Sequence, residues 1–483
     1  MKSFPQVSPE SAGVSSKALL NMMKKLSGLK YLNSIIVLRH GRSILECFLE
    51  PYECNTPHQL FSLSKSFVSC AVGLAQSEGR LKLSDTLISF FPEYDGCVTD
   101  PRMRKATLRD LLTMRSGHLV GAEDYMLGKQ DFVKAYLASP LDTEPGTRFT
   151  YNSGATYMLS AVIRKVTGEN VREYLMPRLF EPLRISPGIW ETCPKGIDLG
   201  GWGFYLTTGD LAKFAQLLLQ HGEWQGRQIL PPDYLAEAVS KQADNSMNEN
   251  PDWKLGYGYQ FWISKYGYRG DGAGGQLAVI LEDQDLCIAA TSSMNNMQEL
   301  LNIFWDELVP HLKPDPLPEA PEDWLALKNY AAALKIPVPA AENGQRRAAA
   351  SFCFRENTAG VRQCDISFGD DCCALTFHYG AGMEQLRAGF GHFEYSVLRL
   401  TDSMPRRTAA YALWTAPDVL EIHSFICDGI VRYVWTVDFS DREEPVRSRN
   451  ICGCFHTKFP KLISVSPKTE RKPSEFFSSD KTI

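Results

Sequence analysis

The feature that most constrains the fold is an apolar helix that begins beside a serine and a lysine, within residues 59–79. After Leu63, apolar residues recur at the spacing of one helical face through residue 75, and Gly79 follows as a typical helix stop. Such a helix is expected to be buried against other elements. Ser62 therefore lies at the start of a buried helix, with Lys65 one turn later.

This Ser-x-x-Lys pair has the components of a nucleophilic site. Residues three apart share a helical face and can touch. Burial disfavours an ammonium group, so the pKa of Lys65 is expected to fall and its amine could accept the Ser62 proton. Free N–H groups at the helix start would favour a developing oxyanion. The pattern alone is weak, because it also occurs at Ser27/Lys30 and Ser478/Lys481, which open no apolar helix.

Length and composition indicate a globular protein of two or three domains. The chain has 483 residues, of which 44% are hydrophobic and 22% are charged, and this composition suits a large core. A net charge of −5 and the absence of a Lys/Arg block argue against nucleic-acid or membrane-surface partners. The first residues lack an apolar leader and no apolar run is long enough to span a bilayer, so we expect a cytoplasmic protein.

Cysteine and histidine placement predicts neither a metal nor a cofactor. The 13 cysteines are odd in number and scattered, as expected of reduced thiols. The cluster at 452–456, Cys-Gly-Cys-Phe-His, could form half a metal site. No second Cys-x-x-Cys pair accompanies it, so alternation along a strand explains it better. We interpret His58 and His118 as ordinary loop residues.

Patterns in residues 1–313 predict one domain with strands, an all-helical insert, further strands and a last helix. The signal between 118 and 143 is thin and predicts a loop with a short helix, a candidate lid. Glycines in the loop at 270–275 permit close approach to a ligand. Helices are expected at 8–30, 64–78, 107–112, 155–166, 211–219 and 297–312, and strands at 34–38, 43–48, 257–263, 276–281 and 286–291.

The sequence pattern changes after residue 313, from that of the first domain to a linker and then a β domain. Residues 314–345 read as a Pro-rich rigid linker followed by a short helix at 322–334. Alternating segments with Gly and Asp turns predict an antiparallel β domain, a sandwich or small barrel, over 346–460. The Lys/Pro/Ser-rich residues 461–483 are expected to be a disordered tail. The strands of the β domain are expected at 350–354, 364–368, 374–377, 396–400, 409–414, 419–424 and 431–439.

Four separated motifs together resemble those of one enzyme superfamily. They are Phe61–Lys65 (FSLSK), Leu111–His118 (LLTMRSGH), Pro145–Ser153 (PGTRFTYNS) and Thr207–Phe214 (TTGDLAKF). In this order they are similar to motifs of the serine β-lactamase and penicillin-binding protein superfamily, closest to the class C β-lactamase-like esterases and amidases. The resemblance covers about residues 5–312. It implies an α/β (α+β) fold, an antiparallel sheet flanked by helices plus an all-helical subdomain, to which the all-β C-terminal domain is added.

The resemblance also implies roles for single residues. Ser62 would be the acylated nucleophile, Lys65 its base, and Tyr151 a second acid/base whose phenolate is favoured beside the lysine ammonium. The oxyanion hole would combine the backbone N–H groups of Ser62 and Ala273. Four further residues are then candidates for substrate binding: Asn152, Ser153, Asp271 and Gly272.

Two departures from the family pattern bear on the substrate. Gly270 stands where many relatives carry a Lys or His cation, and strand alternation would turn the adjacent Arg269 to the other face. Asp271 would repel a carboxylate. The order of residues 151–153, Tyr-Asn-Ser, also differs from the family's Tyr-Ser-Asn. We therefore expect a neutral or cationic ester or amide rather than a β-lactam or a peptide carboxylate.

Together these features predict a serine hydrolase that cleaves a small ester or amide through an acyl-enzyme. A D-amino-acid amidase or peptidase, or a penicillin-binding protein, is the alternative among enzymes. A non-catalytic binding scaffold on the same fold is the alternative of another class. An α/β-hydrolase is disfavoured because no Gly-x-Ser-x-Gly occurs. The C-terminal β domain could mediate homo-oligomerisation.

Overall fold

The computed structural model describes residues 4–340, 347–357, 360–380, 382–399 and 404–451, and the strand at 464–468. The chain forms two compact units. Unit 1 comprises Met1–Leu49 and Glu53–Leu334, and unit 2 comprises Glu50–Tyr52 and Lys335–Ile483. The short segment at 50–52 belongs to unit 2 because the Ile336 N–H donates a hydrogen bond to the Glu50 carbonyl (2.9 Å).

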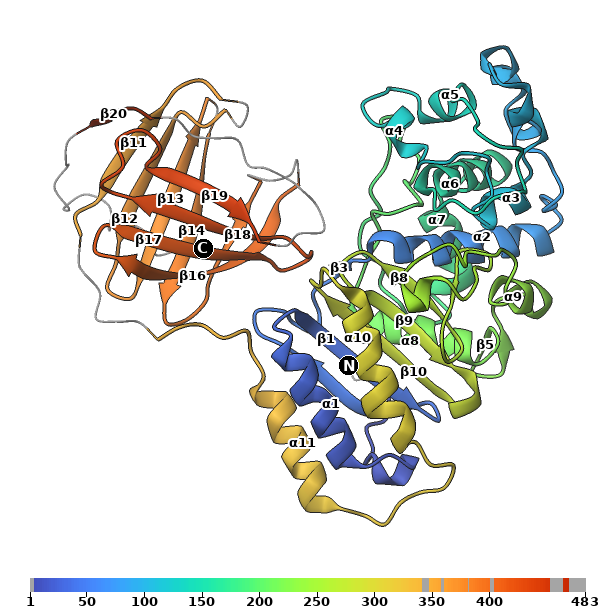
Figure 1. Cartoon of the computed structure of the whole chain (residues 1–483), viewed down its shortest axis with the longest axis horizontal. Coiled ribbons are helices and arrows are strands. Elements are labelled where there is room, and N and C mark those ends of the chain that lie inside the picture. Colours follow the sequence, from blue (N-terminus) through green and yellow to red (C-terminus); the bar gives the residue numbers. More distant parts are fainter. Residues whose placement is uncertain are drawn as a thin grey trace. The chain divides into compact units, whose positions relative to one another are not determined.

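Unit 1 is built on a six-stranded antiparallel sheet with the order β2-β1-β10-β9-β8-β7 (Figure 1). Its central strands are buried on both faces, which explains why they are nearly continuous apolar runs. The predicted hairpin is confirmed by β1 and β2. The strands are β1 (Leu32–Arg39), β2 (Arg42–Phe48), β7 (Trp262–Ile263), β8 (Tyr268–Gly272), β9 (Gln276–Leu281) and β10 (Leu286–Ser292).

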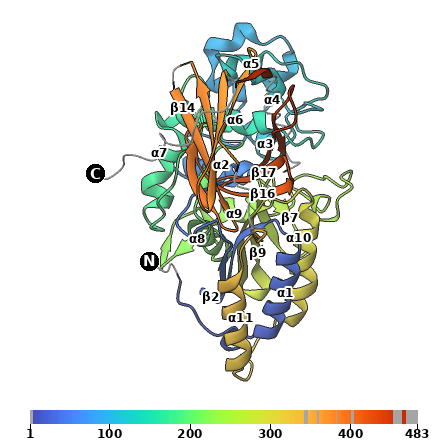
Figure 2. The same cartoon turned by 90° about the vertical axis from the view of Figure 1, so that its left-hand side faces the viewer.

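Helices cover both faces of this sheet. Helices α1 (Ser16–Gly28), α10 (Met297–Ile303) and α11 (Pro321–Ala333) lie on one face, as Figures 1 and 2 show. Helices α2 (Ser64–Ser77) and α8 (Thr208–Leu219) lie on the other. Side chains of β1 alternate between the two cores, as the pleat requires. Helix α11, which the sequence placed in the linker region, packs in unit 1 against α1.

The helical subdomain lies between β2 and β7 in the sequence. A capping box of Thr107 and Asp110 starts α3, and Gly168 in the left-handed region ends α6. The segment at 118–143 holds two short helices whose apolar side chains enter the core, so it is a packed part of the subdomain and not the predicted lid. The helices are α3 (Leu108–Leu112), α4 (Glu123–Met126), α5 (Phe132–Leu137), α6 (Ser153–Thr167), α7 (Val171–Leu175) and α9 (Pro232–Ala238).

Three predicted elements of unit 1 differ from the structure. The helix expected at 8–30 begins only at Ser16 in α1, because Gly13 adopts a φ of +70° and Val14 forms a β-bridge with Leu312. The strand expected at 257–263 is confined to β7, because Gly258 packs directly against the Ala238 carbonyl and Gln260 adopts a φ of +66°. The helix expected at 297–312 is regular only in α10. It then widens into a π-helical turn, η9 (Phe304–Leu308), and tightens into the 3₁₀ turn η10 (Val309–His311).

Short elements complete unit 1. Two small two-stranded antiparallel sheets pair β3 with β4, which are distant in the sequence, and β5 with β6, which form a hairpin. Their bounds are β3 (His58–Gln59), β4 (Tyr205–Leu206), β5 (Glu223–Trp224) and β6 (Arg227–Gln228). The short helical turns are η1 (Glu10–Ala12), η2 (Phe61–Leu63), η3 (Leu87–Phe90), η4 (Pro92–Cys97), η5 (Pro101–Lys105), η6 (Met176–Phe180), η7 (Pro251–Trp253) and η8 (Glu282–Gln284).

Unit 2 is a ten-stranded sheet around its own apolar core, as its alternating sequence predicts. The strand order is β19-β18-β17-β16-β14-β13-β12-β11-β20, and β15 pairs with β16. All pairs are antiparallel except β14 with β16. The strands are β11 (Ala350–Phe354), β12 (Gln363–Phe368), β13 (Cys372–Tyr379), β14 (Gly382–Phe390), β15 (Glu394–Leu398), β16 (Arg406–Ala416), β17 (Val419–Ile426), β18 (Arg432–Asp438), β19 (Val446–Asn450) and β20 (Ser464–Lys468).

Three strands of unit 2 were not expected. Strands β14 and β19 are rich in exposed polar residues and carry too little apolar alternation to be recognised. Strand β20 lies within the predicted disordered tail and pairs with β11. The rest of that tail, and the Cys-Gly-Cys-Phe-His cluster at 452–456, lie outside the described residues.

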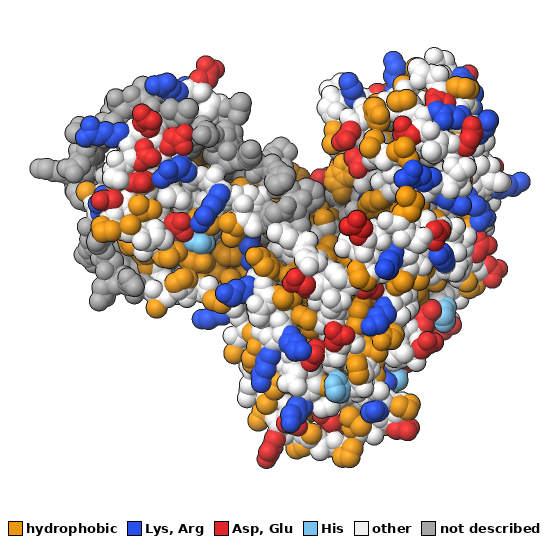
Figure 3. All heavy atoms as spheres, viewed as in Figure 1, with side chains coloured by type: hydrophobic (Ala, Val, Ile, Leu, Met, Phe, Trp, Pro, Cys, Tyr) orange, Lys and Arg blue, Asp and Glu red, His pale blue; other side chains and the backbone are white. Residues whose placement is uncertain are grey.

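The described surface carries both signs of charge. On the face of unit 1 drawn in Figure 3, Lys and Arg side chains are interspersed with Asp and Glu side chains. In the described ranges, no helix is both long and apolar enough to cross a membrane. The same ranges hold no group of three or more His, Cys, Asp or Glu side chains arranged to bind a metal ion.

Candidate active site

A cleft of about 410 Å³ in unit 1 brings together residues from the predicted site. It contains the nucleophile candidate, the tyrosine, the aspartate and the oxyanion-hole candidate, together with two tryptophans and several carboxamides. The cleft therefore combines a reactive side chain with the means to orient a small molecule. Its lining residues are Ser62, Tyr151, Asn248, Asn250, Trp253, Trp262, Asp271, Ala273, Asn295, Asn296, Met297 and Gln298.

Ser62 occupies the 3₁₀ turn η2, directly ahead of α2. The residue before it, Phe61, adopts a φ of +48°, a left-handed conformation that is unfavourable for a bulky side chain. The Ser64 hydroxyl donates a hydrogen bond to the Phe61 carbonyl (2.6 Å) and so helps to hold this turn. Backbone strain of this kind often accompanies functional sites. The turn keeps Ser62 partly exposed, while residues 64–75 of α2 are buried.

Lys65 is only 1% exposed and has three neutral partners. Its Nζ donates hydrogen bonds to Ser62 Oγ (2.9 Å), Ser153 Oγ (3.1 Å) and the Gly201 carbonyl (2.6 Å). Burial lowers the pKa of Lys65 to about 7, against the attraction of the Glu123 and Asp271 carboxylates. The predicted fall in pKa is therefore confirmed, and the amine is close enough to Ser62 to accept its proton.

Tyr151 lies between the amine and the aromatic wall of the cleft. Its ring stacks on that of Trp262, with centroids 5.4 Å apart and planes at 22°, and the Lys65 Nζ lies 4.8 Å from the centroid of the tyrosine ring. Tyr151 and Ser62 both line the cleft, and the Ser62 side chain favours the phenolate form of Tyr151. Burial, reinforced by Asp271, raises the pKa of Tyr151. The expectation of a favoured phenolate is wrong, because desolvation outweighs the nearby lysine, and the side chain is a neutral phenol.

The turn after β8 lies against the nucleophile turn. A Cβ at Gly272 would collide with the Leu60 carbonyl, so glycine is needed for this close approach. The Met294 N–H donates a hydrogen bond to the Gly274 carbonyl (2.9 Å), which holds the turn. Among the residues that the structure describes, no hydrogen-bond acceptor is present for the backbone N–H of Ser62 or Ala273. Two free donors beside the nucleophile are the components of an oxyanion hole.

Arg269 and Asp271 form a buried ion pair on β8. Arg269 Nε donates a hydrogen bond to Asp271 Oδ2 (3.0 Å), and the guanidinium is wholly buried. A Cβ at Gly270 would point toward Ser66 on α2, so Arg269 lies on the opposite face of the strand. This arrangement confirms the predicted orientation of Arg269. Only the aspartate of the pair lines the cleft.

Two other predicted site residues, Asn152 and Ser153, lie near the cleft but do not line it. The Asn152 amide is fully used: its Oδ1 accepts hydrogen bonds from the N–H groups of Ala122 and Ala155, and its Nδ2 donates to Ser116 Oγ. Asn152 thus caps α6 and has no group directed at a substrate. The Ser153 hydroxyl is hydrogen-bonded to Lys65 Nζ and does not face the cleft.

The two histidines are structural. His118 is buried between Ser116 Oγ and Ser139 Oγ, and burial lowers its pKa to about 4, so the ring is neutral. His58 lies on β3, where its ring contacts the Asn33 side chain (3.2 Å). Neither residue lines the cleft, but both are buried, and His58 lies in a strand and not in the loop that the sequence predicted.

Several functional positions carried no signal in the sequence. The Gly201 carbonyl accepts a hydrogen bond from Lys65 Nζ, but Gly201 belongs to a loop without a recognisable sequence pattern. Glu123 lies near Lys65, and its carboxylate accepts the Gly154 N–H (3.3 Å) at the start of α6. Trp253 ends the 3₁₀ turn η7 and Trp262 lies on the short strand β7, where an aromatic residue is usually only part of a core.

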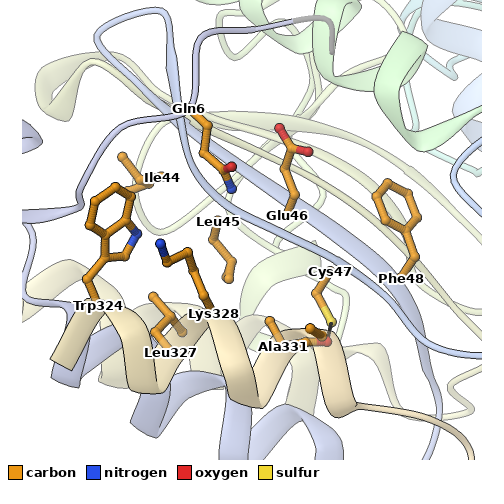
Figure 4. A pocket seen from close by; sticks show the side chains of 11 residues that line it. Gln6, Ile44, Leu45, Glu46, Cys47, Phe48, Trp324, Leu327, Lys328 and Ala331 are labelled. Atoms are coloured by element: carbon orange, nitrogen blue, oxygen red, sulfur yellow. Dashed lines mark hydrogen bonds between the residues drawn. The ribbon is translucent and has the colours of Figure 1, made fainter. Parts of the chain in front are cut away.

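A second pocket of unit 1 lacks the combination of nucleophile and base that is found at the Ser62 cleft. It measures about 310 Å³ and lies between β2 and α11, lined by Trp324, Leu327 and Lys328 on the helix side (Figure 4). Its one thiol, Cys47, is directed at the Ala331 carbonyl (3.4 Å), and burial raises the pKa of that thiol to about 12. A neutral thiol is a poor nucleophile. The cleft at Ser62 is therefore the better candidate active site.

Comparisons with known proteins place this site in context. The sequence model of the family described as Beta-lactamase matches residues 33–302. A β-lactamase of Escherichia coli K12 is 26% identical over 32% of this chain and 40% of its own length. Lovastatin esterase of Penicillium rubens is 26% identical over 30% of this chain and 42% of its own length. The chain thus spans less than half the length of these two curated relatives.

One solved structure extends the likeness beyond unit 1. The crystal structure of SurE superposes with a TM-score of 0.51 at 16% sequence identity, covering 84% of this chain and 97% of that one. At this level of identity the superposition concerns the fold alone. The covered part of this chain is longer than unit 1, so the similarity reaches into unit 2.

Proposed function

Because this chain belongs to the Beta-lactamase family, we propose that it is a serine hydrolase that cleaves a small ester or amide through an acyl-enzyme on Ser62. Lys65 acts as the base toward Ser62, and Tyr151 acts as the second acid/base. The backbone N–H groups of Ser62 and Ala273 form the oxyanion hole. The established fold supports a hydrolase, and the geometry at Ser62 supports this mechanism.

The hydrogen bonds of Lys65 carry the proposal. A neutral amine has two N–H donors and one lone pair. The Gly201 carbonyl can only accept, whereas the hydroxyls of Ser62 and Ser153 can donate or accept. If the two N–H donors serve Gly201 and Ser153, the lone pair faces the Ser62 hydroxyl. The buried site therefore satisfies the neutral amine completely, which is the state that a base requires.

In acylation, Ser62 Oγ loses its proton to Lys65 Nζ and bonds to the substrate carbonyl carbon. The carbonyl oxygen becomes an oxyanion, which the N–H groups of Ser62 and Ala273 stabilise. The neutral phenol of Tyr151 donates a proton to the leaving group as the scissile bond breaks, and the proton on Lys65 replaces it. In deacylation, water attacks the acyl carbon, its proton passes to the same pair, and Ser62 is regenerated.

The pKa of Lys65 predicts the pH dependence of the reaction. Because that pKa is about 7, the amine is protonated below this pH and cannot accept the Ser62 proton. We expect kcat/KM for an uncharged ester to fall about tenfold per pH unit below pH 7, and to level off above it. Steady-state kinetics from about pH 5 to about pH 9 measure this profile. A rate that is constant over that range, or that rises toward acid, would contradict the role of Lys65.

Fluorophosphonate labelling tests the proposed function. A hydrolase of this kind is expected to be labelled at Ser62, and Ser62→Ala is expected to abolish both the label and ester turnover. Ser27→Ala is the matched control, since Ser27 also belongs to a Ser-x-x-Lys sequence but contacts the Lys24 carbonyl and the Tyr330 hydroxyl, away from the cleft. Wild-type protein without a label at Ser62 would favour the binding-scaffold alternative.

A further inference from the structure

The ion pair beside the nucleophile has an unusual set of partners. Arg269 Nη1 donates hydrogen bonds to Ser264 Oγ (2.7 Å) and the Asp252 carbonyl (3.1 Å), and Nε donates to Asp271 Oδ2 (3.0 Å). Nη2 has no hydrogen-bond partner within the described part of the chain, although the whole side chain is buried. A buried guanidinium with an unused donor attracts any available carboxylate.

Aromatic rings hold the guanidinium in place. The Arg269 Cζ lies 4.5 Å from the ring centroid of Trp253 and 5.9 Å from that of Trp262. Both tryptophans also line the cleft, but Arg269 does not. Asp271, which is two residues along the same strand and 7% exposed, lines it with Ser62. The carboxylate is thus the member of the pair that a ligand in the cleft meets.

This placement determines which ligands the cleft can accept. A carboxylate on the substrate would be repelled by the Asp271 oxygens, which line the cleft, because like charges brought together at an interface disfavour binding. A cation on the substrate gains little, because Arg269 already compensates the charge of Asp271. The tryptophan faces and the carboxamides of the cleft suit uncharged groups.

We propose that Asp271 determines substrate specificity: it masks the Arg269 guanidinium from the cleft and restricts the enzyme to acyl donors that are uncharged near the scissile carbonyl. This inference rests on the proposed acyl transfer at Ser62 and narrows the earlier expectation of a neutral or cationic substrate. It also means that removal of the Asp271 charge leaves the positive charge of the Arg269 guanidinium uncompensated beside the tryptophans of the cleft.

A matched pair of esters tests the inference. p-Nitrophenyl hexanoate and mono-p-nitrophenyl adipate have acyl chains of equal length, and only the adipate carries a terminal carboxylate. We expect the wild type to favour the hexanoate in kcat/KM by about tenfold or more. In Asp271→Asn and Asp271→Ala, the ratio of adipate to hexanoate kcat/KM should rise by about tenfold or more. The ratio cancels any effect of the substitutions on Lys65, because both esters use the same base.

Asp244→Asn is the control, because Asp244 is an exposed carboxylate of unit 1 that pairs with Lys241. It removes the same charge and should leave the ratio unchanged. A wild type that hydrolyses both esters equally well overturns the inference even if neither Asp271 variant folds. An unchanged ratio in folded, active variants also overturns it. If the wild type hydrolyses neither ester and Ser62 is not acylated, the proposed function itself fails.

Discussion

Lys65→Met is expected to lower kcat/KM for an uncharged ester by about 10³-fold or more while the protein remains folded. Methionine has nearly the length of lysine and suits the apolar surroundings of α2, but it cannot accept the Ser62 proton. Ester kinetics and thermal unfolding of the same preparation measure both effects. Lys213→Met is the matched control, since Lys213 on α8 pairs with Asp210 and is absent from the cleft.

The same substitution should stabilise the fold at neutral pH. The pKa of Lys65 is about 7 in the folded protein and 10.5 in its ordinary state. Between these values the unfolded chain binds a proton that the folded chain lacks, so the buried amine destabilises the wild type, and this penalty shrinks as pH rises toward 10.5. We expect Lys65→Met to raise Tm most at or below pH 7. A variant that retains wild-type turnover, or that unfolds more readily at pH 7, would contradict this account.

Tyr151→Phe is expected to reduce kcat by about 10²- to 10⁴-fold. The substitution removes the hydroxyl that faces Ser62 across the cleft lining but keeps the ring that stacks on Trp262. The leaving group then lacks its proton donor, while packing of the cleft wall is retained. We expect a larger loss of turnover for an ester with a poor leaving group than for a p-nitrophenyl ester, because departure of a poor leaving group depends more on protonation.

Tyr257→Phe provides the control for Tyr151→Phe. Tyr257 packs edge-to-face on Trp262, with ring centroids 4.8 Å apart, in the same aromatic cluster, but it does not line the cleft. Its loss of one hydroxyl should leave turnover close to that of the wild type. Equal losses in both variants would mean that the aromatic cluster acts only through packing, and Tyr151 would have no role in proton transfer.

The periodicity of apolar residues identified those helices and strands that bury one regular face. The buried helix at Ser62, the hairpin of β1 and β2, and most strands of unit 2 follow from apolar spacing. The failures have local causes. The helices within 118–143 are too short to show a period, and the strand expected from residue 257 is stopped by the packing of Gly258 on α9. Strand β14 has one largely exposed half, so its polar residues gave no strand signal.

The candidate site could be predicted only in part. A spacing of three brought Ser62 and Lys65 together, because helix geometry fixes that distance. The sequence could not show that Asn152 is a helix cap, since Asn serves equally well in caps and in ligand binding. Strand alternation places Arg269 and Asp271 on the same face, but the burial of their ion pair beside two tryptophans depends on tertiary packing. The raised pKa of Tyr151 also depends on burial. Neither burial is encoded in local spacing.

Capture of the acyl-enzyme tests the central claim most directly. Wild type and Ser62→Ala are mixed with p-nitrophenyl hexanoate, quenched in acid within the first turnover, and examined by intact-protein mass spectrometry and peptide mapping. The account predicts a hexanoyl adduct on Ser62 in the wild type, its disappearance on longer incubation as water releases the acid, and no adduct in Ser62→Ala. Turnover of the ester with no adduct at Ser62, or with an adduct that persists in Ser62→Ala, would contradict it.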